Sequence, residues 1–96
     1  MQTVQMTFDL GNYRHTQIYR DGMWAIYEQQ HKAADVRRYE VVRLRVVPPT
    51  TWPNGTTSPE REIYPSSSEW GRMGWTCFSR AEAETLLARE QQRTDG

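Results

Sequence analysis

The chain has 96 residues, which is enough for one domain with a modest hydrophobic core and too few for two. Its 12 Lys and Arg residues balance 12 Asp and Glu residues, so charge gives no strong reason to expect a nucleic acid or an anionic membrane as partner. A single cysteine excludes an internal disulfide and is typical of a reducing cytoplasm. We expect neither a signal peptide nor a membrane span, because no apolar run is long enough.

Three consecutive antiparallel strands are predicted for the first third of the chain, over residues 3–10, 13–20 and 23–30. Apolar and polar residues alternate in the first of them, which is typical of a half-buried strand. The second predicted strand carries polar residues on both of its faces. Asp21-Gly22 then predicts a two-residue hairpin of type I′.

The middle of the chain is predicted to form a long strand and a hairpin. Residues 31–35 are a polar connector, either one helical turn or a loop, and residues 36–47 form the longest predicted strand. The Pro-Pro pair at 48–49 stops this strand, because proline has no backbone N–H for the ladder. We expect a loop at 50–59 and a short strand at 60–64 that pairs back.

A capping box marks the start of the last third. Ser66 precedes Glu69 by three residues, a spacing that predicts a short helical turn. Gly71 is expected to end this turn, because glycine tolerates the left-handed conformation of a C-cap. Residues 74–78 are β-prone and follow a glycine-bounded turn, so they are predicted to form a short strand.

A second capping box, formed by Ser79 and Glu82, begins an amphipathic helix that is predicted to run to about residue 92. We expect residues 94–96 to be a frayed tail. The predicted fold is a single α+β domain over residues 1–96. It is an antiparallel meander of about four or five strands, with one C-terminal helix packed on one face.

Trp70 and Trp75 allow two interpretations. We favour a role in packing, in which both plug the seam between helix and sheet, because large aromatic side chains dominate small cores. The alternative is a pair that stacks on a ligand or on nucleic acid bases.

No motif for catalysis, a metal or a cofactor accompanies these elements. Cys77 as a nucleophile would need a base and an oxyanion donor, so we interpret it as a small buried side chain. His15 and His31 have no Cys or carboxylate at zinc-ligand spacing and are interpreted as surface or edge residues. The protein is therefore predicted to be non-enzymatic, without metal or cofactor. The enzymatic alternative is a small hydrolase, which would need a pocket with converging polar groups.

Several segments together resemble a group of small uncharacterised proteins encoded by bacteriophages and prophages. The segments are YEVV at residues 39–42, YPSS at 64–67 and WGxxGWT at 70–76, followed by a short Ala/Glu helix. The resemblance covers about residues 24–89. It implies a bacterial host cell and a cytoplasmic location, but no catalytic residue is carried over, because the group has no assigned activity.

One helix is expected to cover one face of the sheet and to leave the other face open. We expect that open face to carry Tyr39, Arg43 and Arg45 at its centre, with Tyr27, Tyr19 and Tyr13 beside them. Tyr and Arg are enriched in binding hot spots, and they also stack on and clamp single-stranded nucleic acid. The alternative is a solvated face stiffened by cross-strand aromatic pairs.

These observations predict a phage accessory protein that binds a bacterial host or defence-system protein. Anti-CRISPR and anti-restriction inhibitors are analogous in size and origin. A regulator that binds single-stranded nucleic acid through the same face is the alternative, and the balanced charge favours the protein partner. The oligomeric state is left open, a homodimer included.

Overall fold

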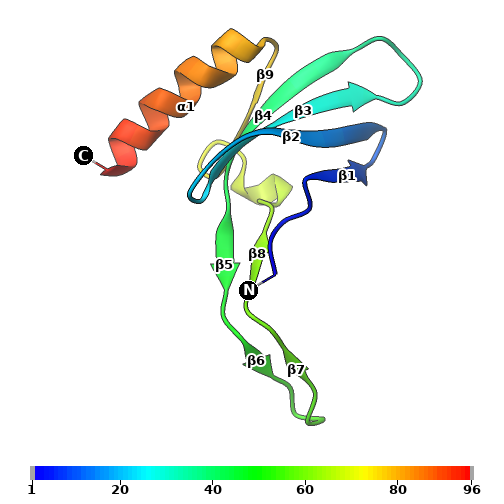
Figure 1. Cartoon of the computed structure of the whole chain (residues 1–96), viewed down its shortest axis with the longest axis vertical. Helices are drawn as coiled ribbons and strands as arrows, with labels where there is room; N and C mark the ends of the chain where they lie inside the picture. Colours follow the sequence, from blue (N-terminus) through cyan, green and yellow to red (C-terminus); the bar gives the residue numbers. More distant parts are fainter. Residues whose placement is uncertain (1, 96) are drawn as a thin grey trace.

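A computed structural model describes residues 2–95, and their side chains for residues 2–93. Its main element is a five-stranded antiparallel sheet with the order β1-β2-β3-β4-β9. The strands are β1 (Thr7–Leu10), β2 (Tyr13–Asp21), β3 (Trp24–His31), β4 (Arg37–Arg43) and β9 (Gly74–Cys77). One helix, α1 (Arg80–Asp95), follows β9 and lies against one side of the sheet (Figure 1). The predicted α+β class with one C-terminal helix is confirmed.

The hairpin between β2 and β3 is confirmed, but its turn differs from the prediction. Asp21 pairs with Trp24, so the loop consists of Gly22 and Met23. Gly22 has φ of 59°, and among residues 2–95 no residue other than glycine has a positive φ. A positive φ at the first loop position alone corresponds to a type II′ turn rather than type I′.

The long strand predicted at residues 36–47 is interrupted at Leu44. This residue is buried, and its N–H donates to the carbonyl of Met23 at 2.6 Å, which ends β4 and turns the chain away from the sheet. The chain then forms β5 (Arg45–Val47), β6 (Thr50–Thr51), β7 (Thr57–Ser58) and β8 (Arg61–Ile63). β5 pairs with β8 and β6 with β7, so the predicted long hairpin is present. We call residues 45–63 the arm; it projects away from the sheet (Figure 1).

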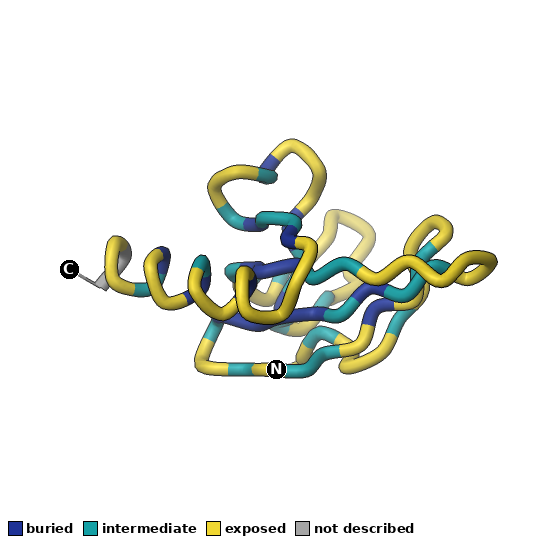
Figure 2. The backbone as a smooth tube through the Cα atoms, turned by 90° about the horizontal axis from the view of Figure 1, so that it is seen from above, coloured by how far each residue is buried: buried dark blue, intermediate teal, exposed yellow. Residues whose placement is uncertain are grey.

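Side chains are buried on both faces of the sheet. The core beneath α1 contains Trp24, Ile26, Val41, Cys77, Ala83 and Leu87. The opposite face buries Ala25, Tyr27, Val42 and Leu44 against Val4, Phe8, Tyr64 and Trp70. The expectation of an open second face is therefore wrong, because the N-terminal residues and the segment after the arm cover it. In Figure 2 the buried backbone positions gather in the centre, with exposed positions at the hairpin turns.

Trp70 and Trp75 both pack, but on opposite faces of the sheet. The ring of Trp75 stacks on that of Trp24 on the α1 side, with centroids 6.2 Å apart. Trp70 packs on the other face, where its Nε1 donates to the hydroxyl of Thr76 at 3.0 Å. The predicted packing is confirmed for each, although they do not form a pair. Cys77 is fully buried, and burial raises the pKa of its thiol, in keeping with a packing role.

Both predicted helix starts are present. Ser79 Oγ accepts from the N–H of Glu82 at 3.1 Å, which caps α1. The N–H of Ser66 donates to Glu69 Oε1 at 3.1 Å at the start of the 3₁₀ helix η1 (Ser67–Glu69), and this bond lowers the pKa of Glu69. α1 continues to Asp95, so it includes two residues of the predicted frayed tail; Gly96 lies outside the described residues. Within residues 2–95, no helix has the length and apolar character needed to cross a membrane.

Candidate functional site

The three residues predicted at the centre of an open face lie elsewhere. Tyr39 packs against the core on the α1 side, and the guanidinium of Arg43 lies 5.6 Å from the centre of the Trp24 ring on the same side. Arg45 belongs to β5, where it approaches Glu69 at 3.5 Å. The shared face is therefore a wrong prediction, because α1 covers the face with Tyr39 and Arg43 and the chain leaves the sheet before Arg45.

Of the three tyrosines predicted beside them, Tyr27 and Tyr19 are also separated. Tyr27 is fully buried opposite α1; its hydroxyl donates to the carbonyl of Gln5 and accepts from Gln17 Nε2, both at 2.9 Å. Burial raises the pKa of Tyr27. Tyr19 is 42% exposed and pairs with Ile26, so a bulge in β2 places it on the α1 side. Partner binding by these residues stays a prediction.

The face opposite α1 contains an open pocket of about 390 Å³ with a buried polar cluster at its base. β2, β3 and β4 supply His15, Gln29 and Glu40, and Tyr64 packs over them after β8. His15 Nε2 lies 3.3 Å from Glu40 Oε1 and 2.9 Å from Gln29 Nε2. The Tyr64 hydroxyl donates to the same Glu40 oxygen. Burial, with the Glu40 carboxylate, raises the pKa of Tyr64, so this hydroxyl keeps its proton.

Three buried polar atoms of the pocket residues have no protein partner within residues 2–95. They are His15 Nδ1, Gln29 Oε1 and Arg38 Nε. Arg38 stands beside the cluster, with its guanidinium carbon 4.1 Å from the centre of the Tyr13 ring. Buried polar groups are normally hydrogen-bonded, so this pocket holds more polar capacity than its own packing uses.

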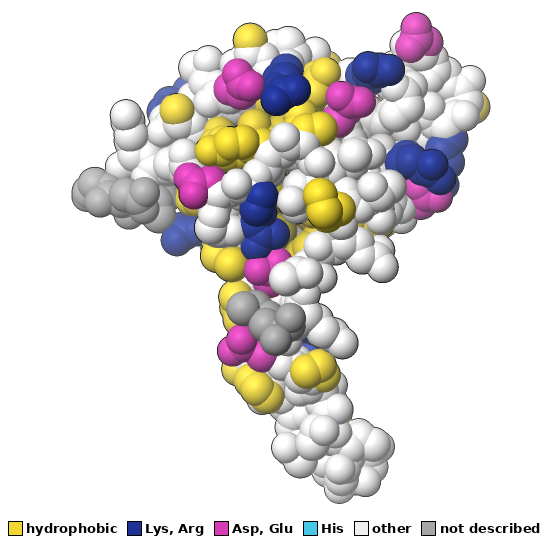
Figure 3. All heavy atoms as spheres, viewed as in Figure 1, with side chains coloured by type: hydrophobic (Ala, Val, Ile, Leu, Met, Phe, Trp, Pro, Cys, Tyr) yellow, Lys and Arg dark blue, Asp and Glu magenta, His cyan; other side chains and the backbone are white. Residues whose placement is uncertain are grey.

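The second candidate is the arm. Residues 46–59 carry no ionisable side chain, and Figure 3 shows no Lys, Arg, Asp or Glu at the distal end of the arm. Trp52 lies near the tip with 49% of its surface exposed, and its Nε1 donates to Ser58 Oγ at 3.0 Å. The N–H of Trp52 donates to the carbonyl of Thr56, and Asn54 Oδ1 accepts from the N–H and the hydroxyl of Thr56. These bonds order the tip.

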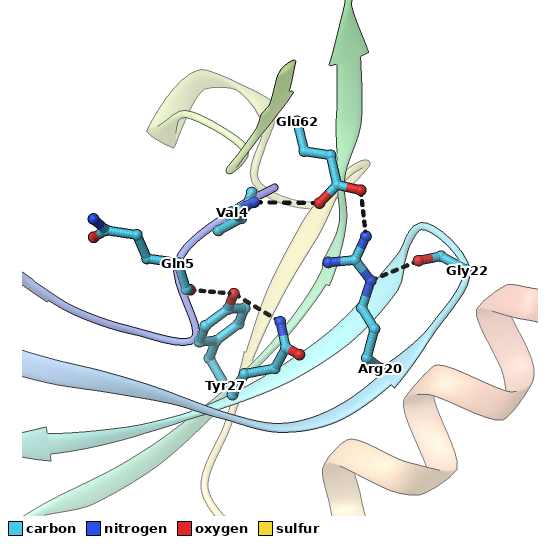
Figure 4. Close-up of polar contacts among 7 residues, drawn as sticks. Val4, Gln5, Arg20, Gly22, Tyr27 and Glu62 are labelled. Carbon is cyan, nitrogen blue, oxygen red and sulfur yellow. Dashed lines mark hydrogen bonds and ion pairs between the residues drawn. The ribbon is translucent and has the colours of Figure 1, made fainter. Parts of the chain in front are cut away.

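Glu62 fixes the root of the arm to the body. Its Oε2 accepts from Arg20 Nη2 at 2.6 Å and its Oε1 from the N–H of Val4 at 3.3 Å (Figure 4). Arg20 Nε also donates to the carbonyl of Gly22 at 2.6 Å. Burial acts to raise the pKa of Glu62, but the hydrogen bonds from Arg20 and Val4 outweigh it and lower the pKa below its usual value.

The pocket was not predicted, although the sequence contains a signal for it. His15 is 1% exposed, so its interpretation as a surface or edge residue is wrong. It lies in a strand that is polar on both sides, and one side of such a strand must face the core. Arg38 and Glu40 continue, at every second position, the row of the buried residues Val42 and Leu44, so strand geometry brings a cation and a carboxylate to the same buried side.

Within residues 2–95, no group of three or more His, Cys, Asp or Glu side chains is arranged to hold a metal ion. Comparisons of the chain with protein family models, with curated proteins and with solved structures find no match. The resemblance of residues 24–89 to phage-encoded proteins stays a prediction. The candidates for function are therefore the two described above, the pocket opposite α1 and the arm.

Proposed function

We propose that the protein is a non-enzymatic binding module that inserts the tip of its arm into an apolar groove of another protein. The observation that carries this proposal is the exposed Trp52 on a two-stranded ribbon that projects from the sheet and is uncharged over residues 46–59. Tryptophan is among the residue types most enriched in binding hot spots.

The arm has features that favour binding over a role in the fold. β6 and β7 form a two-stranded sheet of their own, and such an isolated ribbon adds little stability to a domain. Its tip is ordered by internal hydrogen bonds, and its root is fixed by the Arg20–Glu62 pair. A segment that is ordered before it binds loses less conformational entropy on binding.

The charge of the arm favours a protein over a nucleic acid. Residues 46–59 have no Lys or Arg to neutralise phosphates, which supply most of the affinity in nucleic acid binding. The Tyr and Arg residues considered for single-stranded nucleic acid do not share an open face. The resemblance to phage proteins suggests a bacterial partner, and a protein of a host defence system is the partner class that we expect.

The test is capture from bacterial lysates with three proteins: wild type, Trp52→Ala and Phe78→Ala. Phe78 is a matched control, because it is an exposed aromatic residue (73%) that precedes α1, outside the arm. We expect a protein that wild type and Phe78→Ala capture and Trp52→Ala does not. With the purified partner, Trp52→Ala should weaken binding by at least about tenfold.

Other outcomes would contradict the proposal. Equal capture by all three proteins would place the interaction outside the arm. A gel shift of wild type with single-stranded DNA or RNA at physiological salt would favour the nucleic acid alternative. A dimer in sedimentation experiments that Trp52→Ala dissociates would identify the arm's partner as a second copy of the chain.

A further inference from the structure

We infer that the pocket opposite α1 binds a small free amino acid with an apolar side chain, whose ammonium group contacts Glu40 and whose carboxylate contacts Arg38. This inference is independent of the arm and of its partner. It is based on the geometry of the two charged side chains and of the aromatic residues around them.

Glu40 provides the site for the ammonium group. One of its oxygens, Oε1, accepts from the Tyr64 hydroxyl and lies 3.3 Å from His15 Nε2. The other oxygen, Oε2, has no hydrogen-bond partner among residues 2–95, although the side chain is only 10% exposed and lines the pocket. A buried carboxylate with one free oxygen facing a pocket is suited to a charge-assisted bond from an ammonium group.

Arg38 provides the site for the carboxylate. It forms no ion pair with the described side chains, its Nε is buried without a partner, and the Tyr13 ring supports its guanidinium. The planar guanidinium presents paired N–H donors that match a carboxylate. An anionic group in the pocket would give this cation the partner that the protein does not supply.

The placement of the two residues suits one small zwitterion. Arg38 and Glu40 lie two positions apart in β4, therefore on one face, and both line the pocket. The ammonium and carboxylate groups of an α-amino acid are attached to one carbon, so a single small ligand carries both charges into this one pocket. The zwitterionic ligand and the Arg38–Glu40 pair are each neutral overall, so binding leaves no unpaired buried charge.

The remaining wall of the pocket suits an apolar side chain. Tyr13, Tyr64 and Trp70 line it, together with Leu10 and Pro65. The pocket volume of about 390 Å³ is within the range of small-ligand sites. Such a lining favours an aliphatic or aromatic amino acid over a polar one.

Titration of the wild-type protein with L-phenylalanine and L-leucine tests the inference. Calorimetry and amide NMR spectra are the readouts, and we expect saturable shifts around Glu40 and Arg38 at millimolar concentrations or below. Phenethylamine lacks the carboxylate and 3-phenylpropionate lacks the ammonium group. Each should bind at least about tenfold more weakly than phenylalanine. Absence of shifts with both amino acids at millimolar concentrations, or equal binding of all three phenyl compounds, would overturn the inference.

Substitutions separate the two ends of the ligand. Arg38→Gln should weaken the binding of phenylalanine and 3-phenylpropionate about tenfold and leave the binding of phenethylamine unchanged. Glu40→Gln should weaken the binding of phenethylamine about tenfold and leave that of 3-phenylpropionate unchanged. Arg37→Gln is the control, because Arg37 is the exposed neighbour on the α1 side. If Arg37→Gln weakens phenylalanine as much as Arg38→Gln does, the inference is wrong. If Glu40→Gln does not fold, the comparison of phenylalanine with 3-phenylpropionate still tests the ammonium site.

Discussion

Arg20 and Glu62 lie 42 residues apart in the sequence and meet in an ion pair with Nη2 and Oε2 separated by 2.6 Å. Arg20 comes from the end of β2 and Glu62 from β8, so the pair joins the sheet to the arm. The Glu62 side chain is only 4% exposed, and without Arg20 it would keep its hydrogen bond from Val4 alone.

Arg20→Gln is therefore expected to lower the free energy of unfolding by about 1–3 kcal/mol. Arg14→Gln is the control, because Arg14 pairs with Asp9 where both side chains are largely exposed, and its loss should cost less than about 1 kcal/mol. Urea denaturation measures both. A cost for Arg14→Gln as large as that for Arg20→Gln would contradict the role given to the Arg20–Glu62 pair.

The same pair predicts a dependence of stability on pH. Glu62 has a lowered pKa in the folded protein, so its contribution is fully present above the unfolded value of about 4.5 and is lost as pH falls through the folded pKa. Melting temperatures between pH 7 and pH 3 should fall less steeply for Arg20→Gln than for wild type. Parallel curves would show that Glu62 does not contribute to the acid loss.

Ser79→Ala tests the cap of α1. We expect a loss of about 1 kcal/mol, because the N–H of Glu82 loses its acceptor. Thr85→Ala is the control; Thr85 is exposed within the helix, and alanine is the better helix former, so stability should be unchanged or slightly higher. Thermal melts followed by circular dichroism give both values. An unchanged Ser79→Ala melt would remove the cap assignment.

Trp75→Ala tests the core beneath α1. Removal of the ring from its stack on Trp24 should cost about 2–3 kcal/mol, which is below the usual range for a core tryptophan because Trp75 is only partly buried. Trp52→Ala, at the exposed tip of the arm, should cost less than about 1 kcal/mol. Equal costs in urea denaturation would contradict the packing role given to Trp75 beneath α1.

The local elements of the fold could be predicted because each has a local cause. The glycine of the β2–β3 hairpin and the serines that precede η1 and α1 act within a few residues of the chain. The half-buried strand predicted at residues 3–10 is only partly present, because β1 spans Thr7–Leu10 and Leu10 is exposed. The break at Leu44 could not be predicted, since it depends on a hydrogen bond to Met23 across the sheet.

The choice of face was the main error, and it has a physical reason. β4 places Val41 on one side and Val42 on the other, and both are fully buried, so its alternation alone does not say which side α1 covers. The pocket was missed for a different reason, because Glu40 and His15 are covered by Tyr64, which follows the arm and is distant from both in the sequence.

The close contact between Gly74 and Trp70 gives the last prediction. A Cβ at position 74 would lie 2.4 Å from Cζ3 of the Trp70 ring, so Gly74→Ala must displace that ring. The ring lines the pocket and is hydrogen-bonded to Thr76, so we expect a loss of about 1–3 kcal/mol and a change in the near-ultraviolet circular dichroism. Thr76→Val removes only the hydrogen bond and should cost about 1 kcal/mol with the ring in place. Because both substitutions break the same bond, the difference between them isolates the steric effect. If Gly74→Ala is no more destabilising than Thr76→Val and has the wild-type spectrum, the Trp70 ring does not pack on Gly74.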